Sequence, residues 1–299
     1  MITRALFRQQ VPAAGGATKE PIERPAAVNR PVTREHPDAL IVAGGGAKAI
    51  SALGAIHALH RNGRLSNLKM VAGTSAGAIV AAGVALGRPP LDMCKAFVKD
   101  VYAPEFDLQN FSRTFGVDAG GHIARWIDIV LDGQYTFESI REVTGIDLVV
   151  CATNLNRRKP AYFSAEKTPT VDVATAIRMS CAIPLYFSAV TLDDEVFVDG
   201  AICDNFPYEW VASRDDIECP LGISYTSRDQ RGGDVKSLDQ YLAALVQCAT
   251  NQQHTRANAN VLELECGDTK VFDFKSPKAL KKLFKAGVVQ TGEWMKKQS

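Results

Sequence analysis

Two apolar segments, each followed by a glycine-rich turn and an alanine-rich stretch, constrain the fold of this chain most. Residues 39–43 (ALIVA) lead into Gly44-Gly45-Gly46, and residues 68–72 (LKMVA) lead into Gly73-Thr74-Ser75-Ala76-Gly77. Short apolar runs that end at turn residues are typical of buried strands. The alanine-rich stretches are predicted helices, and Asn62-Gly63 ends the first one. Repeated strand, turn and helix units predict a parallel sheet covered by helices.

The second unit lies within an uncharged run of 18 residues, from Met70 to Gly87, which just reaches the length of a membrane span. It also contains Gly73-x-x-x-Gly77, a packing motif of membrane helices. Alanine and glycine dominate the run, however, so its insertion energy would be poor. We therefore interpret it as a buried strand, a turn and a buried helix.

The rest of the chain reads as one α/β domain over residues 38–299, preceded by a flexible arm over residues 1–37 that is rich in Pro, Ala and Arg. Further strands are predicted at residues 147–152 and 195–198. Residues 91–145 are expected to be helical and looped. Aromatic side chains between residues 97 and 126 suggest either core packing or a lid and channel for a ligand.

Composition excludes some classes of function. The formal net charge is +1, which argues against a nucleic-acid-binding protein. The seven cysteines are widely spaced without a Cys-x-x-Cys pair, which favours reduced thiols over a disulfide framework or a zinc site. The arm contains no apolar run long enough for a secretory signal. We expect a cytoplasmic protein or one peripheral at membranes, and the sequence leaves delivery into another compartment or host open.

The near-zero charge hides a segregated pattern. No acidic residue lies between Asp38 and Asp92, which suits a site that must hold an anion. Residues 275–299 contain seven lysines and one glutamate. Ser276-Pro277 predicts a helix start and Gly287 its end. This Lys-rich C-terminal segment is a candidate for peripheral contact with a membrane, or else a helix whose Leu280, Leu283 and Phe284 pack on the domain.

Chemistry is suggested by Gly73-Thr74-Ser75-Ala76-Gly77, which fits the pattern Gly-x-Ser-x-Gly. A serine at the tip of a tight strand-to-helix turn is exposed above the sheet, and glycines two residues away on either side remove Cβ clashes. The helix that follows favours developing negative charge. Gly44, Gly45 and Gly46 follow the neighbouring strand, and their backbone N–H groups predict an oxyanion hole.

The same glycines also match a relaxed dinucleotide fingerprint, Gly44-x-Gly46-x-x-Ala49. That fingerprint requires an acidic residue about 20 positions further on, to hold the ribose. The next acid in the sequence is Asp92, which comes too late. The dinucleotide interpretation therefore fails.

A nucleophilic serine needs a base, and two candidates remain. Asp199 ends an apolar run and precedes Gly200, so a strand delivers a carboxylate onto a glycine turn. Such an aspartate needs desolvation to raise its pKa before it becomes an effective base. The alternative is a Ser75, Asp199 and His254 triad, although His254 lies in a polar stretch rather than on a loop after a strand.

Four blocks carry a resemblance to a known family: residues 43–49 (AGGGAKA), 73–78 (GTSAGA), 176–187 (AIRMSCAIPLYF) and 198–201 (VDGA). In this order and spacing the chain resembles the patatin-like phospholipases from about Ala39 to Met295. The resemblance implies a three-layer α/β/α fold with a mostly parallel central sheet. It also implies a Ser75–Asp199 dyad, an oxyanion hole at Gly44–Gly46, and motif-supporting roles for Lys48, Gly73, Gly77 and Gly200. One departure is Ala49, where the family usually has glycine.

The resemblance implies a phospholipase A-type lipid acyl hydrolase that needs no metal or other cofactor. Its substrate would be a phospholipid or another acyl-ester lipid, and nucleic acid is not expected as a partner. A non-catalytic or partner-activated lipid-binding protein with the same fold, and a Ser-Asp-His esterase using His254, are the alternatives.

Overall fold

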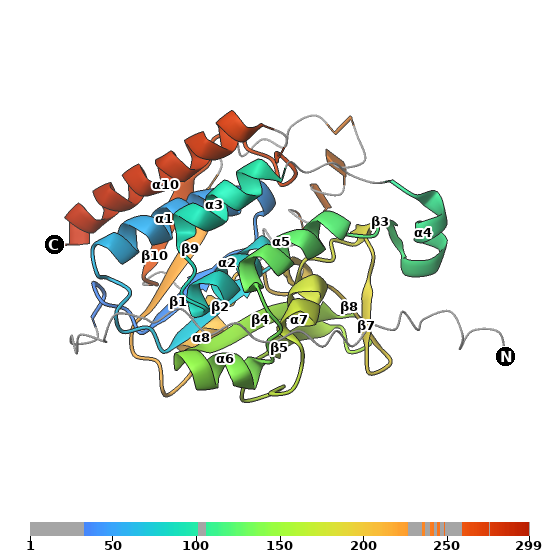
Figure 1. Ribbon diagram of the computed structural model, residues 1–299, viewed down its shortest axis with the longest axis horizontal. Coiled ribbons are helices and arrows are strands. Elements are labelled where there is room, and N and C mark those ends of the chain that lie inside the picture. Colours follow the sequence, from blue (N-terminus) through green and yellow to red (C-terminus); the bar gives the residue numbers. More distant parts are fainter. Residues whose placement is uncertain are drawn as a thin grey trace.

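The computed structural model describes residues 33–100, 106–226, 259–274 and 276–298, together with residues 235, 236, 240, 241, 244, 245 and 248. The predicted α/β architecture is confirmed, with a twisted central sheet and helices packed on its faces (Figure 1). The uncharged run from Met70 to Gly87 divides into β2 (Met70–Thr74) and α2 (Ala76–Ala85), as predicted. None of the helices in the described residues is long and apolar enough to cross a membrane.

Within the described residues, the main sheet has eight strands. The order is β10-β9-β1-β2-β4-β8-β7, and β5 pairs with β4 outside this path. The first five strands in this order are parallel, whereas β5, β7 and β8 are joined by antiparallel pairing. The bounds of the strands not yet given are β1 (Ala39–Val42), β4 (Asp147–Asn154), β5 (Lys159–Phe163), β7 (Val190–Leu192), β8 (Glu195–Asp199), β9 (Pro220–Thr226) and β10 (Val261–Glu265). A separate parallel pair joins β3 (Gly116–Asp118) to β6 (Leu185–Phe187).

The helices cover the two faces of the sheet unequally. Most pack on the larger core: α1 (Ala49–Arg61), α2, α3 (Pro90–Lys99), α5 (Gly121–Leu131), α6 (Phe137–Thr144), α7 (Val173–Ser180) and α10 (Pro277–Gln298). The smaller core on the opposite face involves α8 (Tyr208–Ala212) and Ile217. Helix α4 (Leu108–Thr114) lies at the periphery beside β3 (Figure 1).

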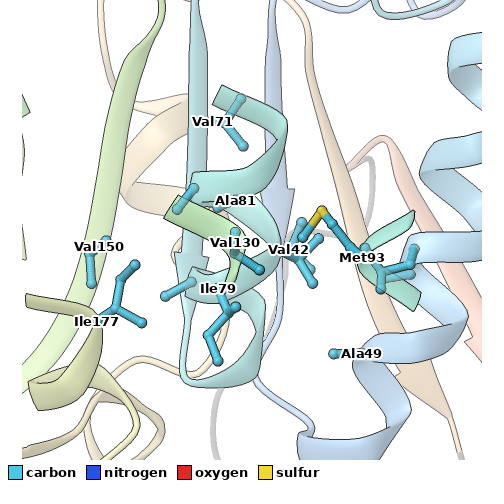
Figure 2. Close-up of a cluster of buried hydrophobic side chains, with 14 of the residues drawn as sticks. Val42, Ala49, Val71, Ile79, Ala81, Met93, Val130, Val150 and Ile177 are labelled. Carbon is cyan, nitrogen blue, oxygen red and sulfur yellow. The ribbon is translucent and has the colours of Figure 1, made fainter. Parts of the chain in front are cut away.

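The sequence of α2 explains its place at the centre of the larger core. Nearly all of its residues are buried, because small apolar side chains allow neighbours on every side to approach closely. Ile79 and Ala81 of this helix lie between Val42 and Val71 of the strands and Val130 of α5 (Figure 2). A helix that is apolar all round belongs inside a protein, as it does here.

The predicted end of the C-terminal helix at Gly287 is wrong, because α10 continues to Gln298. Gly287 instead allows α10 to cross α1 closely: a Cβ built there would lie 1.9 Å from the carbonyl oxygen of Ser51. Gly54 of α1 is needed for the same crossing, because a Cβ built there would lie 2.0 Å from the carbonyl oxygen of Phe284. The apolar residues of α10 (Leu280, Leu283 and Phe284) are buried in this contact, as the packing alternative predicted.

Candidate active site

The turn between β2 and α2 places Ser75 at the carboxyl end of the sheet. Ser75 has a φ of 55°, a left-handed conformation that is uncommon for a residue with a side chain. A Cβ at Gly73 would lie 2.3 Å from the carbonyl oxygen of Gly77, and one at Gly77 would lie 2.4 Å from that of Val42. The two glycines therefore permit the close packing that holds the serine on a sharp turn.

Strand β4 brings Asp199 beside this turn. Cys151 of β4 pairs with Thr74, and the next residue, Ala152, pairs with Asp199 at the end of β8. Gly200 allows the end of β8 to lie close to β4, since a Cβ there would lie 2.3 Å from the carbonyl oxygen of Cys151. In consequence the hydroxyl of Ser75 donates a hydrogen bond to Oδ2 of Asp199 at 2.7 Å.

The environment of Asp199 differs from that of a solvated carboxylate. Its side chain is buried, and Oδ1 accepts a single backbone hydrogen bond, from the N–H of Ala201 at 2.9 Å. Burial raises the pKa of Asp199 to about 7, while the hydrogen bonds from Ala201 and Ser75 act in the opposite direction. No ion pair joins Asp199 to a cation among the described residues. A carboxyl group with this pKa can accept or release a proton near neutral pH.

Ser180, at the end of α7, fixes the backbone of the serine turn. Its hydroxyl accepts the N–H of Ser75 at 2.8 Å and donates to the carbonyl oxygen of Cys151. Ser180 is fully buried, so without its side chain the N–H of Ser75 would lose this acceptor in the protein interior. Ser180 belongs to one of the family blocks, but this contact could not be predicted from the sequence, because no local pattern marks it.

The glycine loop after β1 lies against Ser75. A Cβ at Gly44 would lie 3.1 Å from Cβ of Ser75. The N–H of Gly44 donates to the carbonyl oxygen of Asn205 at 3.0 Å, and the amide of Asn205 donates back to the carbonyl oxygen of Gly44. In the described part of the chain, no protein acceptor takes the N–H of Gly45 or Gly46.

Two further contacts shape this loop. The N–H of Lys48 donates to the carbonyl oxygen of Gly45 at 3.1 Å and closes the turn, while burial lowers the pKa of the Lys48 side chain. Gly46 has a φ of 54°, and a Cβ there would lie 2.1 Å from the carbonyl oxygen of Val271. Glycine is required at this position by both backbone conformation and space.

An apolar cavity opens beside Ser75. Its lining comes from the glycine loop, α1, α2, α3, α5 and the segments around Ile183 and Phe272. The lining residues are Gly46, Ala49, Ile50, Ser75, Ala76, Ile79, Val80, Phe97, Ile123, Trp126, Cys181, Ile183, Phe187, Val271, Phe272 and Phe274. Ser75 supplies the hydroxyl in an otherwise apolar wall, so the cavity suits a hydrocarbon chain attached to a reactive group.

The histidines in the described residues do not join this arrangement. His57 packs against the ring of Phe284, and His122 lies near Asp100 and Arg125. No described histidine hydrogen bonds to Ser75 or Asp199. His254, the alternative base, lies outside the described residues.

Comparison with known proteins identifies the family of the chain. Residues 40–211 match the family model described as patatin-like phospholipase, and the chain belongs to this family. It is 26% identical over 205 residues to the uncharacterized protein R571 of Acanthamoeba polyphaga mimivirus, an alignment that covers 64% of this chain and 66% of R571. It is 23% identical over 180 residues to the probable lipid hydrolase 463L of Invertebrate iridescent virus 6, covering 57% of this chain and 61% of 463L.

Among solved structures, VipD from Legionella pneumophila has a similar fold. The TM-score is 0.57 at 18% sequence identity, and the superposition covers 88% of this chain and 67% of VipD. The chain therefore spans about two thirds of the length of each of these relatives. The family and fold are established, and lipid hydrolysis is the class of activity that the family supports.

Proposed function

We propose that the protein is a phospholipase A-type lipid acyl hydrolase in which Ser75 is the nucleophile and Asp199 the general base. The observation that carries this proposal is the 2.7 Å hydrogen bond from the Ser75 hydroxyl to the buried Asp199 carboxylate, beside an apolar cavity. A phospholipid or related acyl ester would place its acyl chain in the cavity and its carbonyl carbon at Ser75. No metal or other cofactor enters this mechanism.

In the first step Asp199 Oδ2 takes the proton from Ser75 as Oγ attacks the acyl carbonyl carbon. The N–H groups of Gly45 and Gly46 are the proposed donors to the oxyanion, whereas Gly44 anchors the loop through Asn205. The tetrahedral intermediate then expels the alcohol portion of the lipid, which takes the proton from Asp199. An acyl group remains on Ser75.

In the second step water attacks the acyl-enzyme while Asp199 accepts its proton. The oxyanion forms again in the same loop, the bond to Ser75 Oγ breaks, and Oγ recovers the proton from Asp199. The product is a free fatty acid. Asp199 thus holds a proton transiently in both steps, which fits a pKa near 7.

Replacement of the nucleophile tests the proposal. Ser75→Ala should abolish fatty-acid release from phospholipid vesicles and covalent labelling by a fluorophosphonate, with Ser213→Ala, an exposed serine at the end of α8, as the matched control. His254→Gln should leave both signals near the wild-type level. An inactive His254→Gln would favour the triad esterase, and a wild-type protein that binds vesicles but hydrolyses none of them would favour the lipid-binding alternative.

A further inference from the structure

Helix α4 presents its apolar side chains to solvent. The exposed fractions are 57% for Phe106, 82% for Leu108, 38% for Phe111, 52% for Phe115 and 43% for Leu185 of the adjacent β6. We call these five residues the α4 patch. The helix itself contains no buried residue. Clustered exposed aromatic and aliphatic groups mark an interaction surface, because water solvates them poorly.

Polar contacts hold α4 in this orientation. The side-chain amide of Asn110 donates to the carbonyl oxygen of Gly116 at 2.8 Å and to Oγ of Ser188 at 2.9 Å. Thr114 Oγ1 lies 2.8 Å from the same hydroxyl, and Asp107 caps the start of the helix. The polar side of the helix therefore faces the protein and its apolar side faces outward, the reverse of an ordinary surface helix.

The α4 patch is continuous with the wall of the cavity beside Ser75. The ring of Phe106 lies 5.8 Å from that of Tyr186, which in turn stacks on Phe272 at 4.3 Å. Phe272 is only partly buried and lines the cavity, as does Phe187 of β6. An apolar path thus leads from the exposed patch to the acyl-chain cavity.

The charges at this surface balance. From Phe106 to Val117 the charged residues are Asp107 and Arg113, both exposed, so the apolar groups carry no net charge with them. An apolar surface without net charge suits the hydrocarbon layer of a bilayer whatever the charge of its headgroups. In the Lys-rich helix α10, by contrast, Leu280, Leu283 and Phe284 are buried against the protein, and Val289 is the large apolar side chain that stays exposed.

We propose that the α4 patch inserts into the surface of a phospholipid bilayer and so places the cavity mouth at the lipid layer. The inference rests on the proposed function, because a lipid hydrolase must reach acyl chains held in a membrane. Leu108, the most exposed member, would enter the bilayer with Phe111 and Phe115. Binding should therefore persist on uncharged vesicles and depend little on salt.

Vesicle binding by the Ser75→Ala protein tests the surface without hydrolysis. In sedimentation with phosphatidylcholine vesicles, adding Leu108→Ser and Phe111→Ser should weaken partitioning at least about tenfold. The matched control, Val143→Ser with Val289→Ser, replaces exposed apolar residues of α6 and α10 and should change it less than about twofold. Thermal unfolding should be recorded for both double variants and the parent, because Phe111 is only 38% exposed, and a cooperative transition above the assay temperature shows that each variant is folded.

A tryptophan reporter locates the inserted surface directly. Leu108→Trp should be quenched by brominated phosphatidylcholine, whereas Val289→Trp should not. Equal partitioning of the patch and control variants would overturn the proposal, as would binding that requires anionic lipid and is lost with Lys281→Glu and Lys285→Glu. A dimer that Leu108→Ser dissociates would instead identify a contact between copies. Vesicle binding through the patch without fatty-acid release from the unmodified protein would refute the proposed function alone.

Discussion

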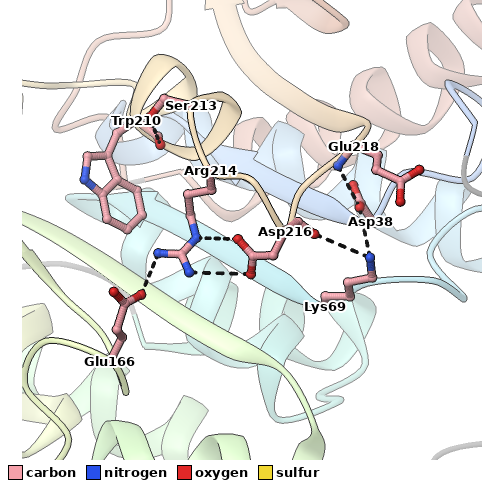
Figure 3. A network of polar contacts seen from close by, with 8 residues as sticks. All are labelled: Asp38, Lys69, Glu166, Trp210, Ser213, Arg214, Asp216 and Glu218. Atoms are coloured by element: carbon pink, nitrogen blue, oxygen red, sulfur yellow. Dashed lines mark hydrogen bonds and ion pairs between the residues drawn. The ribbon is translucent and has the colours of Figure 1, made fainter.

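Two buried aspartates lie at opposite ends of the central sheet and have different surroundings. Asp38 precedes β1 at the amino edge. Its carboxylate accepts the backbone N–H groups of Glu218 and Cys219, each at 2.9 Å, and lies 3.4 Å from the ammonium of Lys69 (Figure 3). Asp199 ends β8 at the carboxyl edge, with one backbone N–H and the Ser75 hydroxyl as its donors.

The difference shows how one residue type serves structure or chemistry. Three donors, one of them charged, replace the lost water around Asp38, so its carboxylate ties together the starts of β1, β2 and β9. Asp199 has fewer donors and no cation partner among the described residues, so burial favours its neutral form. A buried carboxyl group with few hydrogen-bond donors has a raised pKa and can therefore exchange a proton near neutral pH.

Neutralising Asp199 should have the largest effect on catalysis. We expect Asp199→Asn to lower kcat by about 1,000-fold or more, because an amide cannot accept the Ser75 proton and general-base catalysis contributes roughly 100- to 10,000-fold. Burst kinetics with a chromogenic fatty ester would measure this decrease in kcat. Asp38→Asn provides the comparison, since it removes a buried carboxylate at the other end of the sheet. A less than tenfold loss for Asp199→Asn would remove the distinction in function between the two aspartates.

The pH profile should show the next largest effect. With the pKa of Asp199 raised to about 7, kcat/KM should fall about tenfold per pH unit below that value and reach about 1% of its plateau near pH 5. The residual activity of Asp199→Asn should not show this decrease at low pH. If kcat/KM of the wild type instead decreased only around pH 4, Asp199 would be solvated much like an ordinary carboxylate.

The same pKa has a consequence for stability. Between about pH 4 and 7 native Asp199 holds a proton that the unfolded chain has released, so the free energy of unfolding decreases as the pH rises through this range. The full difference amounts to roughly 4 kcal/mol. Asp199→Asn should consequently be more stable than the wild type at pH 8 and similar to it at pH 4, as denaturant unfolding would show.

Ser180→Ala should have an intermediate effect, because it acts on Asp199 only through the position of Ser75. Loss of the acceptor for the Ser75 N–H should lower kcat about 10- to 100-fold, given a cost of roughly 1–3 kcal/mol for an unpaired buried donor. We expect KM to change less than twofold and Ser180→Thr to recover most of kcat. Ser164→Ala is the matched control, since that buried serine also accepts a backbone N–H, from Lys167. Equal losses of kcat in both alanine variants would assign Ser180 a purely structural role.

Local patterns in the sequence correctly predicted the strands and turns that carry the site residues. The strands before Gly44 and Gly73, the serine turn, and the strand that ends at Asp199 each follow from neighbouring residues, and the structure contains all of them. The approach of Ser75 to Asp199 depends on the registers of β4 with β2 and β8, which no local pattern specifies. The residue patterns offered Asp199 as a candidate base for Ser75, and the family resemblance implied a dyad without histidine.

Contacts between distant segments account for what was missed. Ser180 and Asn205 reach the site by tertiary packing, and a buried hydroxyl or a loop carbonyl has no signature in the sequence. Gly287 predicts a helix end because glycine commonly follows one, whereas the close crossing of α10 with α1 requires it here. In the aromatic segment from residue 97 to 126, Phe97 and Trp126 are buried in the larger core and also line the cavity, whereas Phe111 is exposed.

The smallest effect on catalysis, and a clear effect on stability, is expected for Asp38→Asn. The amide keeps one acceptor but turns an N–H₂ group toward the backbone N–H of Glu218, which should lower the free energy of unfolding by about 2–3 kcal/mol. The activity per folded molecule should stay within twofold of the wild type. Asp216→Asn, which weakens the exposed ion pair with Arg214 nearby (Figure 3), should cost less than about 1 kcal/mol. If Asp38→Asn instead lowered kcat without lowering stability, the amino edge of the sheet would be coupled to the reaction, and structure and chemistry would not be divided between the two aspartates.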